Sequence, residues 1–217
     1  MNIEQARFNM VEQQVRPWDV LDPKVLDLLF QLRREDFVPA AARDLAFADL
    51  AIPLGHGVST LPPRMEARMV QELAIEPTDR VLEIGTGSGY VAALLAHLAA
   101  EVLSVEIVPE LAASAALRVA AAAPGRKVRV VQGDGARDWI EGGPWNAILM
   151  SGSLPAEPTA LLQRLAPGGR LLAVVGDAPV MSARLWTRTA QGFSSKVLFE
   201  TVIPALRNAA EPVRFSF

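Results

Sequence analysis

Cysteine is absent from the 217 residues, so the sequence excludes disulfides and thiolate metal sites. Its two histidines are too few for a histidine-rich metal site, and we expect no bound metal. Charge of one sign is also lacking, because 21 basic residues face 24 acidic ones for a net charge of −3. Without a basic stripe, nucleic acid is not an expected partner.

A long uninterrupted apolar run is missing as well. The most apolar region, residues 90–108, contains His97, Glu101 and Glu106, which excludes a membrane span. The N-terminus carries Glu4 and lacks the apolar segment of a signal peptide. Hydrophobic residues still make up 51% of the chain, enough for a sizeable core. We therefore expect a soluble, cytoplasmic protein that folds as a single domain over residues 1–217.

Glycine is concentrated where the chain predicts a strand, a turn and a helix in succession. The apolar run at 81–84 predicts a buried strand, and Gly85, Gly87 and Gly89 follow at every second position before a predicted helix at 91–98. Such a turn lets the backbone approach a ligand closely. The alternative is a tight turn without a ligand. It is disfavoured because three spaced glycines would weaken the element without a compensating gain.

The spacing of these glycines bears on the ligand. A dinucleotide fingerprint has glycine at its sixth position, where this chain has Tyr90, so a nicotinamide or flavin cofactor is disfavoured. The stretch Glu83-Ile-Gly-Thr-Gly-Ser-Gly89 resembles motif I of the S-adenosylmethionine-dependent methyltransferases. This resemblance implies S-adenosyl-L-methionine as cofactor, and cofactor-binding roles for Glu83, Gly85, Thr86, Gly87, Ser88 and Gly89.

Two further predicted strands end in acidic residues. The strand at 102–106 ends in Glu106, followed by Ile107, and its carboxylate can accept both hydroxyls of a ribose. The strand at 128–132 is followed by Gly133-Asp134-Gly135, which in the methyltransferases places an aspartate near the adenine amino group. Because parallel strand ends meet at one edge of a sheet, we expect these turns to form one cofactor site.

The whole pattern predicts an α/β fold of the Rossmann-like class I methyltransferase type. We expect a mostly parallel central sheet, helices on both faces and an N-terminal helical extension. Residues 1–63 would hold helices and an acceptor loop, and residues 64–217 the core with C-terminal antiparallel strands. The predicted helices cover 3–15, 23–34, 64–73, 91–98, 111–123 and 158–165. The predicted strands cover 81–84, 102–106, 128–132, 147–150, 167–176, 182–190, 196–203 and 213–217, whereas 52–63 is expected to be irregular.

The chain resembles the protein-L-isoaspartate O-methyltransferase family over nearly its whole length. The matching stretches are Arg34-Glu-Asp-Phe-Val-Pro39, Phe47-Ala-Asp49, Ile52-Pro-Leu-Gly55, Val81 to Tyr90, Gly133-Asp-Gly135 and Leu165-Ala-Pro-Gly-Gly169. The resemblance implies methyl transfer to the carboxylate of isoaspartyl residues in damaged proteins or peptides, with S-adenosyl-L-homocysteine as product. A carboxylate of pKa near ~3.9 is already ionised at neutral pH, so no general base is needed.

The acceptor loop departs from the family, which usually reads Gly-Gln-Thr-Ile-Ser-x-Pro. Aligned on Gly57 and Pro63, this chain has Val58 for the glutamine, Ser59 for the threonine and Leu61 for the serine. The resemblance implies Ser59 and Thr60 as the catalytic hydroxyls. It implies substrate-binding positions at Val58, Ser59, Leu61 and Arg64.

Because of this departure, two alternatives stand beside isoaspartyl methyl transfer. The first is a divergent sibling that methylates another acceptor. The second is a module that binds the cofactor with little isoaspartyl activity. A nicotinamide-dependent reductase is disfavoured by Tyr90.

Overall fold

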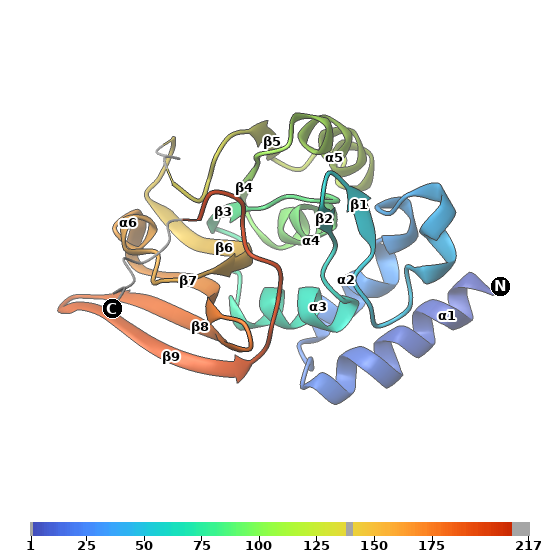
Figure 1. Cartoon of the computed structure of the whole chain (residues 1–217), viewed down its shortest axis with the longest axis horizontal. Helices are drawn as coiled ribbons and strands as arrows, with labels where there is room; N and C mark the ends of the chain where they lie inside the picture. Colours follow the sequence, from blue (N-terminus) through green and yellow to red (C-terminus); the bar gives the residue numbers. More distant parts are fainter. Residues whose placement is uncertain (1, 138–140, 210–217) are drawn as a thin grey trace, which may run out of the picture.

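A seven-stranded sheet forms the centre of the computed structural model, which describes residues 2–137 and 141–209 (Figure 1). The strand order is β5-β4-β3-β6-β7-β8-β9. Neighbouring strands are parallel from β5 to β7, whereas β8 and β9 are antiparallel to their neighbours. The bounds are β3 (Arg80–Ile84), β4 (Glu101–Glu106), β5 (Val128–Gln132), β6 (Trp145–Leu154), β7 (Leu165–Asp177), β8 (Val180–Thr189) and β9 (Gly192–Glu200). This confirms the predicted α/β class and the mostly parallel sheet.

The helices follow the predicted order, with differences at their ends. They are α1 (Ile3–Met10), α2 (Pro23–Gln31), α3 (Pro63–Glu72), α4 (Tyr90–Leu98), α5 (Pro109–Ala122) and α6 (Thr159–Leu162). A π-helical turn (Val11–Val15) and a 3-10 turn (Arg16–Trp18) extend α1, and 3-10 turns also occupy Arg34–Asp36 and Ala40–Leu45. The predicted helix 23–34 is too long, because Leu32 turns extended with ψ 122°. The predicted helix 158–165 is likewise too long, because Leu165 already pairs in β7.

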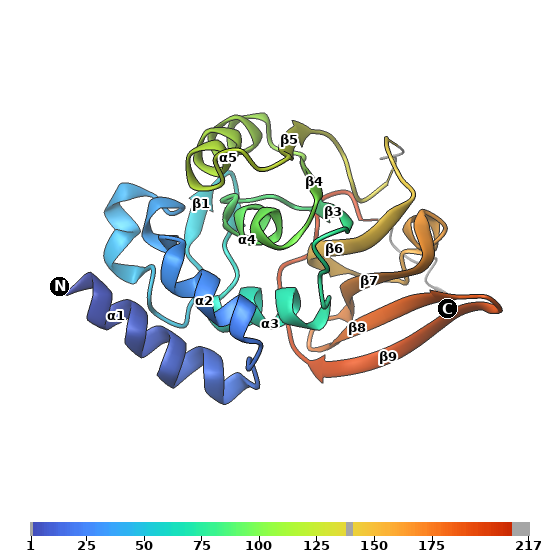
Figure 2. The same cartoon turned by 180° about the vertical axis from the view of Figure 1, so that it is seen from behind.

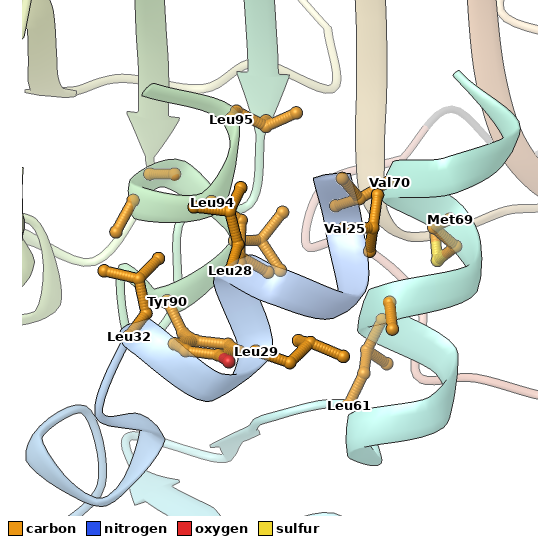
Figure 3. Close-up of a cluster of buried hydrophobic side chains, with 14 of the residues drawn as sticks. Val25, Leu28, Leu29, Leu32, Leu61, Met69, Val70, Tyr90, Leu94 and Leu95 are labelled. Carbon is orange, nitrogen blue, oxygen red and sulfur yellow. The ribbon is translucent and has the colours of Figure 1, made fainter. Parts of the chain in front are cut away.

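Each face of the sheet carries its own apolar core, as the strand alternation requires. Val81 packs on one side with α2, α3 and α4, and Figure 3 shows side chains from these three helices meeting there. Leu82 packs on the opposite side with Trp145 and Trp186. Of the described helices, only α6 adds buried side chains to this second core. The prediction of helices on both faces is confirmed, but the two faces are covered unequally.

The N-terminal extension is joined to the rest by packing and by buried charges. Figure 2 shows α2 beside α3 and α4. The Arg34 guanidinium, 2% exposed, donates to Glu66 Oε2 at 2.9 Å, to Leu61 O at 2.8 Å and to Ala46 O at 2.6 Å. Burial raises the pKa of Glu66, and Arg34 opposes that rise. One arginine thus links the extension, the acceptor loop and α3.

The acceptor segment is more regular than the sequence predicts. Strands β1 (Pro53–Gly55) and β2 (Val58–Ser59) form a short antiparallel hairpin, called the acceptor hairpin below. The expectation of an irregular stretch at 52–63 is therefore wrong at these residues. The turn depends on positive φ at Gly55, His56 and Gly57, at 86°, 53° and 69°. Glycine adopts such angles readily, and this is what the turn-rich composition signals.

Two late strands also differ from expectation. Strand β6 runs on through Ser151 to Leu154, past the predicted end at 150, with an irregular register between Leu149 and Ser153. The last antiparallel strand starts and ends earlier than predicted, because the chain leaves the sheet after Glu200. The expected strand at 213–217 lies outside the described residues. Among the described helices, none is long and apolar enough to cross a bilayer.

Candidate active site

A pocket opens at the carboxyl ends of the parallel strands, where the strand order reverses between β3 and β6. This is the position at which open α/β sheets bind ligands. The pocket contains about 740 Å³ of empty space, its open mouth included. Its walls come from the turns after β3, β4 and β5, the end of β6, the acceptor hairpin and residues 204–207.

The glycine turn after β3 forms one wall. Gly85 and Gly87 line the pocket with φ of 93° and 53°, which glycine tolerates without strain. Gly89 does not line it. A Cβ on Gly89 would lie 3.0 Å from Val119 Cγ2, so this glycine lets α4 pack closely on α5.

Two hydroxyls of the same turn face away from the pocket. Thr86 Oγ1 lies 2.5 Å from Ser104 Oγ, and Ser88 Oγ accepts the Tyr90 N–H at 3.2 Å. Both serve to shape the turn. Of the motif's predicted cofactor residues, the structure brings Gly85 and Gly87 to the pocket and keeps Thr86, Ser88 and Gly89 behind it.

Glu106 and Ile107, at the end of β4, line the next wall. The Glu106 carboxylate accepts the Gly87 N–H at 2.8 Å and the Val108 N–H at 3.0 Å. These bonds fix a carboxylate at the pocket wall beside the glycine turn. A ribose diol needs an acceptor of this kind, so the wall fits the predicted cofactor.

The third turn, Gly133-Asp134-Gly135, closes the end of the pocket next to Glu106. Asp134 Oδ1 accepts the Ala136 N–H at 3.1 Å, and its Oδ2 accepts from Asn208 Nδ2 at 3.0 Å. A Cβ on Gly135 would lie 2.5 Å from Ile84 Cγ2, so only glycine fits this close to β3. The three predicted strand-end turns therefore meet in one place.

Glu83 lies behind the wall and not on it. Its carboxylate is fully buried and accepts from Ser104 Oγ at 2.6 Å and from Ser151 Oγ at 3.0 Å. Burial raises the pKa of Glu83 to about 8, with nearby Glu106 and Glu66 adding to the rise and the two serine hydrogen bonds opposing it. Since Ser151 lines the pocket, its hydrogen bond to Glu83 connects the buried carboxylate to the pocket wall.

The acceptor hairpin separates the residues that the family resemblance groups together. Val58, Ser59 and Leu61 line the pocket, whereas Thr60 does not. Thr60 Oγ1 accepts the Ile52 N–H at 3.0 Å and lies 3.4 Å from Arg34 Nη2, in the buried interior. The structure thus brings Ser59 to the pocket and directs the Thr60 hydroxyl inward.

Leu61 and Arg64 also differ in position. Leu61 touches the pocket but is 7% exposed and belongs to the core between α2 and α3 (Figure 3). Arg64 does not line the pocket. Its Nη1 pairs with Asp49 Oδ2 at 3.1 Å, and its guanidinium lies 4.5 Å from the Trp18 ring centroid. In this structure Arg64 is occupied by internal contacts.

Two parts of the pocket are not among the predicted site residues. Ser151 and Gly152 line it from β6, and small residues directly after a predicted strand end at the same edge could have indicated them. The segment from Pro204 to Arg207 also lines it, next to the end of β6. No pattern in the sequence indicates that this segment returns across the sheet.

The chain is similar to known proteins along nearly its whole length. The model of the family Protein-L-isoaspartate(D-aspartate) O-methyltransferase matches residues 6–204. The chain belongs to this family. Membership makes it an S-adenosylmethionine-dependent methyltransferase, which confirms the enzyme class and the cofactor that the sequence predicts.

Similar members of the isoaspartate O-methyltransferase family come from several bacteria. Protein-L-isoaspartate O-methyltransferase 1 of Anaeromyxobacter sp. (strain Fw109-5) is 46% identical over 160 residues, which is 74% of this chain and 76% of that protein. The protein-L-isoaspartate O-methyltransferase of Synechococcus sp. (strain JA-2-3B'a(2-13)) is 40% identical over 210 residues, 96% of this chain and 83% of that one.

Among solved structures, a family member from Plasmodium falciparum in complex with S-adenosyl-L-homocysteine superposes with a TM-score of 0.79. The two sequences are 19% identical, and the match covers 95% of this chain and 99% of the Plasmodium falciparum chain. At that identity the likeness shows the fold alone, and it agrees with the sheet described above.

Proposed function

We propose that this chain transfers the methyl group of S-adenosylmethionine to the carboxylate of isoaspartyl residues in damaged proteins or peptides. One observation carries the proposal. The glycine turn (Gly85, Gly87), the Glu106 carboxylate and the acceptor hairpin (Val58, Ser59) line a single pocket. Cofactor elements and acceptor elements therefore lie within reach of one ligand pair.

The walls support one orientation of the cofactor. Glu106 suits the ribose hydroxyls, Asp134 and Ile107 suit the adenine end, and the backbone of Gly85 to Gly87 suits the methionine end. Glu83, Thr86, Ser88 and Gly89 would then support the turn without touching the cofactor.

The protein's main task in this reaction is to align the acceptor carboxylate with the methyl group, because an ionised carboxylate needs no base. When bound, the cofactor supplies an electrophilic methyl group. The chain has to hold one carboxylate oxygen in line with that methyl group and exclude water, and such orientation can contribute roughly 7–11 kcal/mol. Ser59 lines the pocket, and in this proposal its hydroxyl donates to the carboxylate.

An assay with methyl-labelled S-adenosylmethionine tests the proposal. The acceptor is a peptide with one isoaspartyl residue, and the control is the same peptide with ordinary aspartate. We expect base-labile methyl ester on the isoaspartyl peptide only. Cofactor binding without label on either peptide would refute the proposal.

Leu61 favours a second candidate, a sibling enzyme with another carboxylate acceptor. Leucine is larger than serine and donates no hydrogen bond, so it narrows the acceptor side of the pocket. Label that appears only on other carboxylates in the same assay would support this candidate.

The location of the protein in the cytoplasm stays a prediction. So does the expectation that it acts on neither nucleic acids nor membranes.

A further inference from the structure

The chain that follows β9 returns across the sheet as a strap, defined here as residues 201–209 and drawn in dark red in Figure 1. Ser153 N donates to Pro204 O and Leu206 N donates to Ser153 O, both at 2.9 Å. The Leu206 side chain rests on the glycine turn, since a Cβ on Gly85 would lie 2.9 Å from Leu206 Cδ2. The strap is thus attached to β6 and forms a wall of the pocket.

Arg207 lies on this strap at the pocket, beside the turn of the acceptor hairpin. It lines the pocket, and its Nη2 would lie 3.5 Å from a Cβ on Gly57. The side chain is exposed, and among the residues that the structure describes it has neither a salt bridge nor a hydrogen bond partner. Of the described residues that line the pocket, it is the one cation.

The two pocket carboxylates are held by other groups. Glu106 is engaged by the backbone N–H groups of Gly87 and Val108, and Asp134 by Ala136 N and Asn208 Nδ2. The pocket therefore has an acidic end for the cofactor's hydroxyl and amino donors. It has a cationic group beside the acceptor hairpin, where a negatively charged acceptor would enter.

We propose that Arg207 is a substrate-binding residue that holds the acceptor carboxylate beside Ser59. The inference rests on the proposed function, methyl transfer to a carboxylate. It answers a deficit described above, because Leu61 supplies no donor and the Thr60 hydroxyl is directed inward. A guanidinium offers two parallel N–H donors that match a carboxylate, and so can replace a single hydroxyl.

The reaction itself determines which kinetic constant Arg207 affects. A carboxylate oxygen forms a bond to the methyl carbon, the methyl carbon–sulfur bond breaks, and its electron pair stays on sulfur. The carboxylate loses its negative charge as the ester forms. Attraction to Arg207 is therefore strongest for the bound substrate, whose carboxylate carries a full charge, and weakens towards the transition state and the neutral product. Loss of such an interaction should raise KM without lowering kcat, because the bound substrate is stabilised at least as much as the transition state.

The test compares Arg207→Gln and Arg207→Lys with Arg126→Gln, a loss of charge at an exposed arginine outside the pocket. We expect Arg207→Gln to raise KM for the isoaspartyl peptide by about tenfold, with kcat within about threefold of wild type. Arg207→Lys should give a KM between those of wild type and Arg207→Gln, because lysine keeps the charge and lacks the paired N–H donors of the guanidinium. Arg126→Gln should match wild type, and all three should retain the Tm and the Kd for S-adenosylhomocysteine.

Peptide binding in the presence of S-adenosylhomocysteine separates this inference from the proposed function. If wild type methylates the peptide and Arg207→Gln has unchanged KM and peptide affinity, the role of Arg207 is refuted and the function stands. If wild type binds the peptide without methylating it, and Arg207→Gln binds about tenfold more weakly, the function fails and the role of Arg207 stands. Wild type that does not bind the peptide refutes both.

Discussion

Glu106 holds the glycine turn and faces the pocket with the same carboxylate. It accepts the Gly87 and Val108 N–H groups, so its removal would loosen the turn as well as remove a ribose acceptor. We expect Glu106→Ala to weaken S-adenosylmethionine binding by about 1.5–3 kcal/mol, the range for a hydrogen bond to a charged group. Calorimetry measures this, with Glu110→Ala, an exposed acid in the first turn of α5, as control. Equal affinity in Glu106→Ala and wild type would exclude this carboxylate from the site.

Glu83 makes the stability of the fold depend on pH. Its folded pKa of about 8 lies above its ordinary value of 4.5, because burial disfavours the charged form. Between these two values the folded state binds more protons than the unfolded state, so this group lowers stability as pH rises. The loss of stability begins near pH 4.5, the ordinary pKa, and is complete above about pH 8, the folded pKa.

Glu83→Gln should remove this dependence, since glutamine is neutral and can still accept from Ser104 or Ser151. We expect the Tm difference, variant minus wild type, to increase from about pH 5 to about pH 8. A series of thermal melts over that range measures it, with Glu110→Gln as control. A difference that stays constant with pH would mean that Glu83 is already ionised in the folded protein.

At the scale of an element, the acceptor hairpin assigns neighbouring residues to different tasks. Side chains alternate along an extended strand, so Ser59 and Thr60 face opposite ways. We expect Ser59→Ala to lower kcat/KM for the isoaspartyl peptide by about tenfold, roughly 1.4 kcal/mol, without changing the Tm. Thr60→Val should instead cost about 1–3 kcal/mol of stability, because it leaves the buried Ile52 N–H without its acceptor.

Denaturant unfolding and steady-state kinetics on the same two variants measure both effects. The pair is its own control, as each variant removes one hydroxyl from adjacent positions. A loss of activity in Thr60→Val that exceeds the loss in Ser59→Ala would reverse the assignment.

The hairpin also shows what the sequence could and could not predict. The strands β3, β4 and β5 were predictable because apolar runs and terminal glycines or acids are local signals. The direction of Thr60 was not, because it depends on a register set by the turn at His56. Arg207 was out of reach for a similar reason, since its place at the pocket depends on pairing between Ser153 and the strap.

At the scale of the whole molecule, the N-terminal extension packs against the rest of the chain, and we predict that it belongs to one folded unit. Arg34 neutralises the buried Glu66 and satisfies two backbone carbonyls, and α1 and α2 bury side chains in the core under α3. We expect a chain that starts at Glu35 to lose the cooperative thermal transition of the full chain. A truncated chain that melts like the full chain would contradict this.

A single substitution tests the contribution of the buried Arg34–Glu66 ion pair. Arg34→Met should destabilise the protein by about 3–5 kcal/mol, because it leaves a buried carboxylate unpaired. Adding Glu66→Gln removes that charge and should recover part of the loss. Chemical denaturation of the single and double variants measures this, and equal stability of the two would show that the pair is not coupled.

The hold on Asp134 has a consequence for chemical ageing. Asp134-Gly135 is the only Asp-Gly step in the sequence, which has no Asn-Gly step. Succinimides form where a following nitrogen can attack the side-chain carbonyl, and glycine leaves that nitrogen unshielded by a side chain. Here both carboxylate oxygens are engaged, by Ala136 N and by Asn208 Nδ2, so the carboxyl group is kept from turning onto its neighbour's nitrogen. Asn208 belongs to the strap, so we expect the strap to slow the conversion of Asp134 into isoaspartate, the group on which the proposed reaction acts.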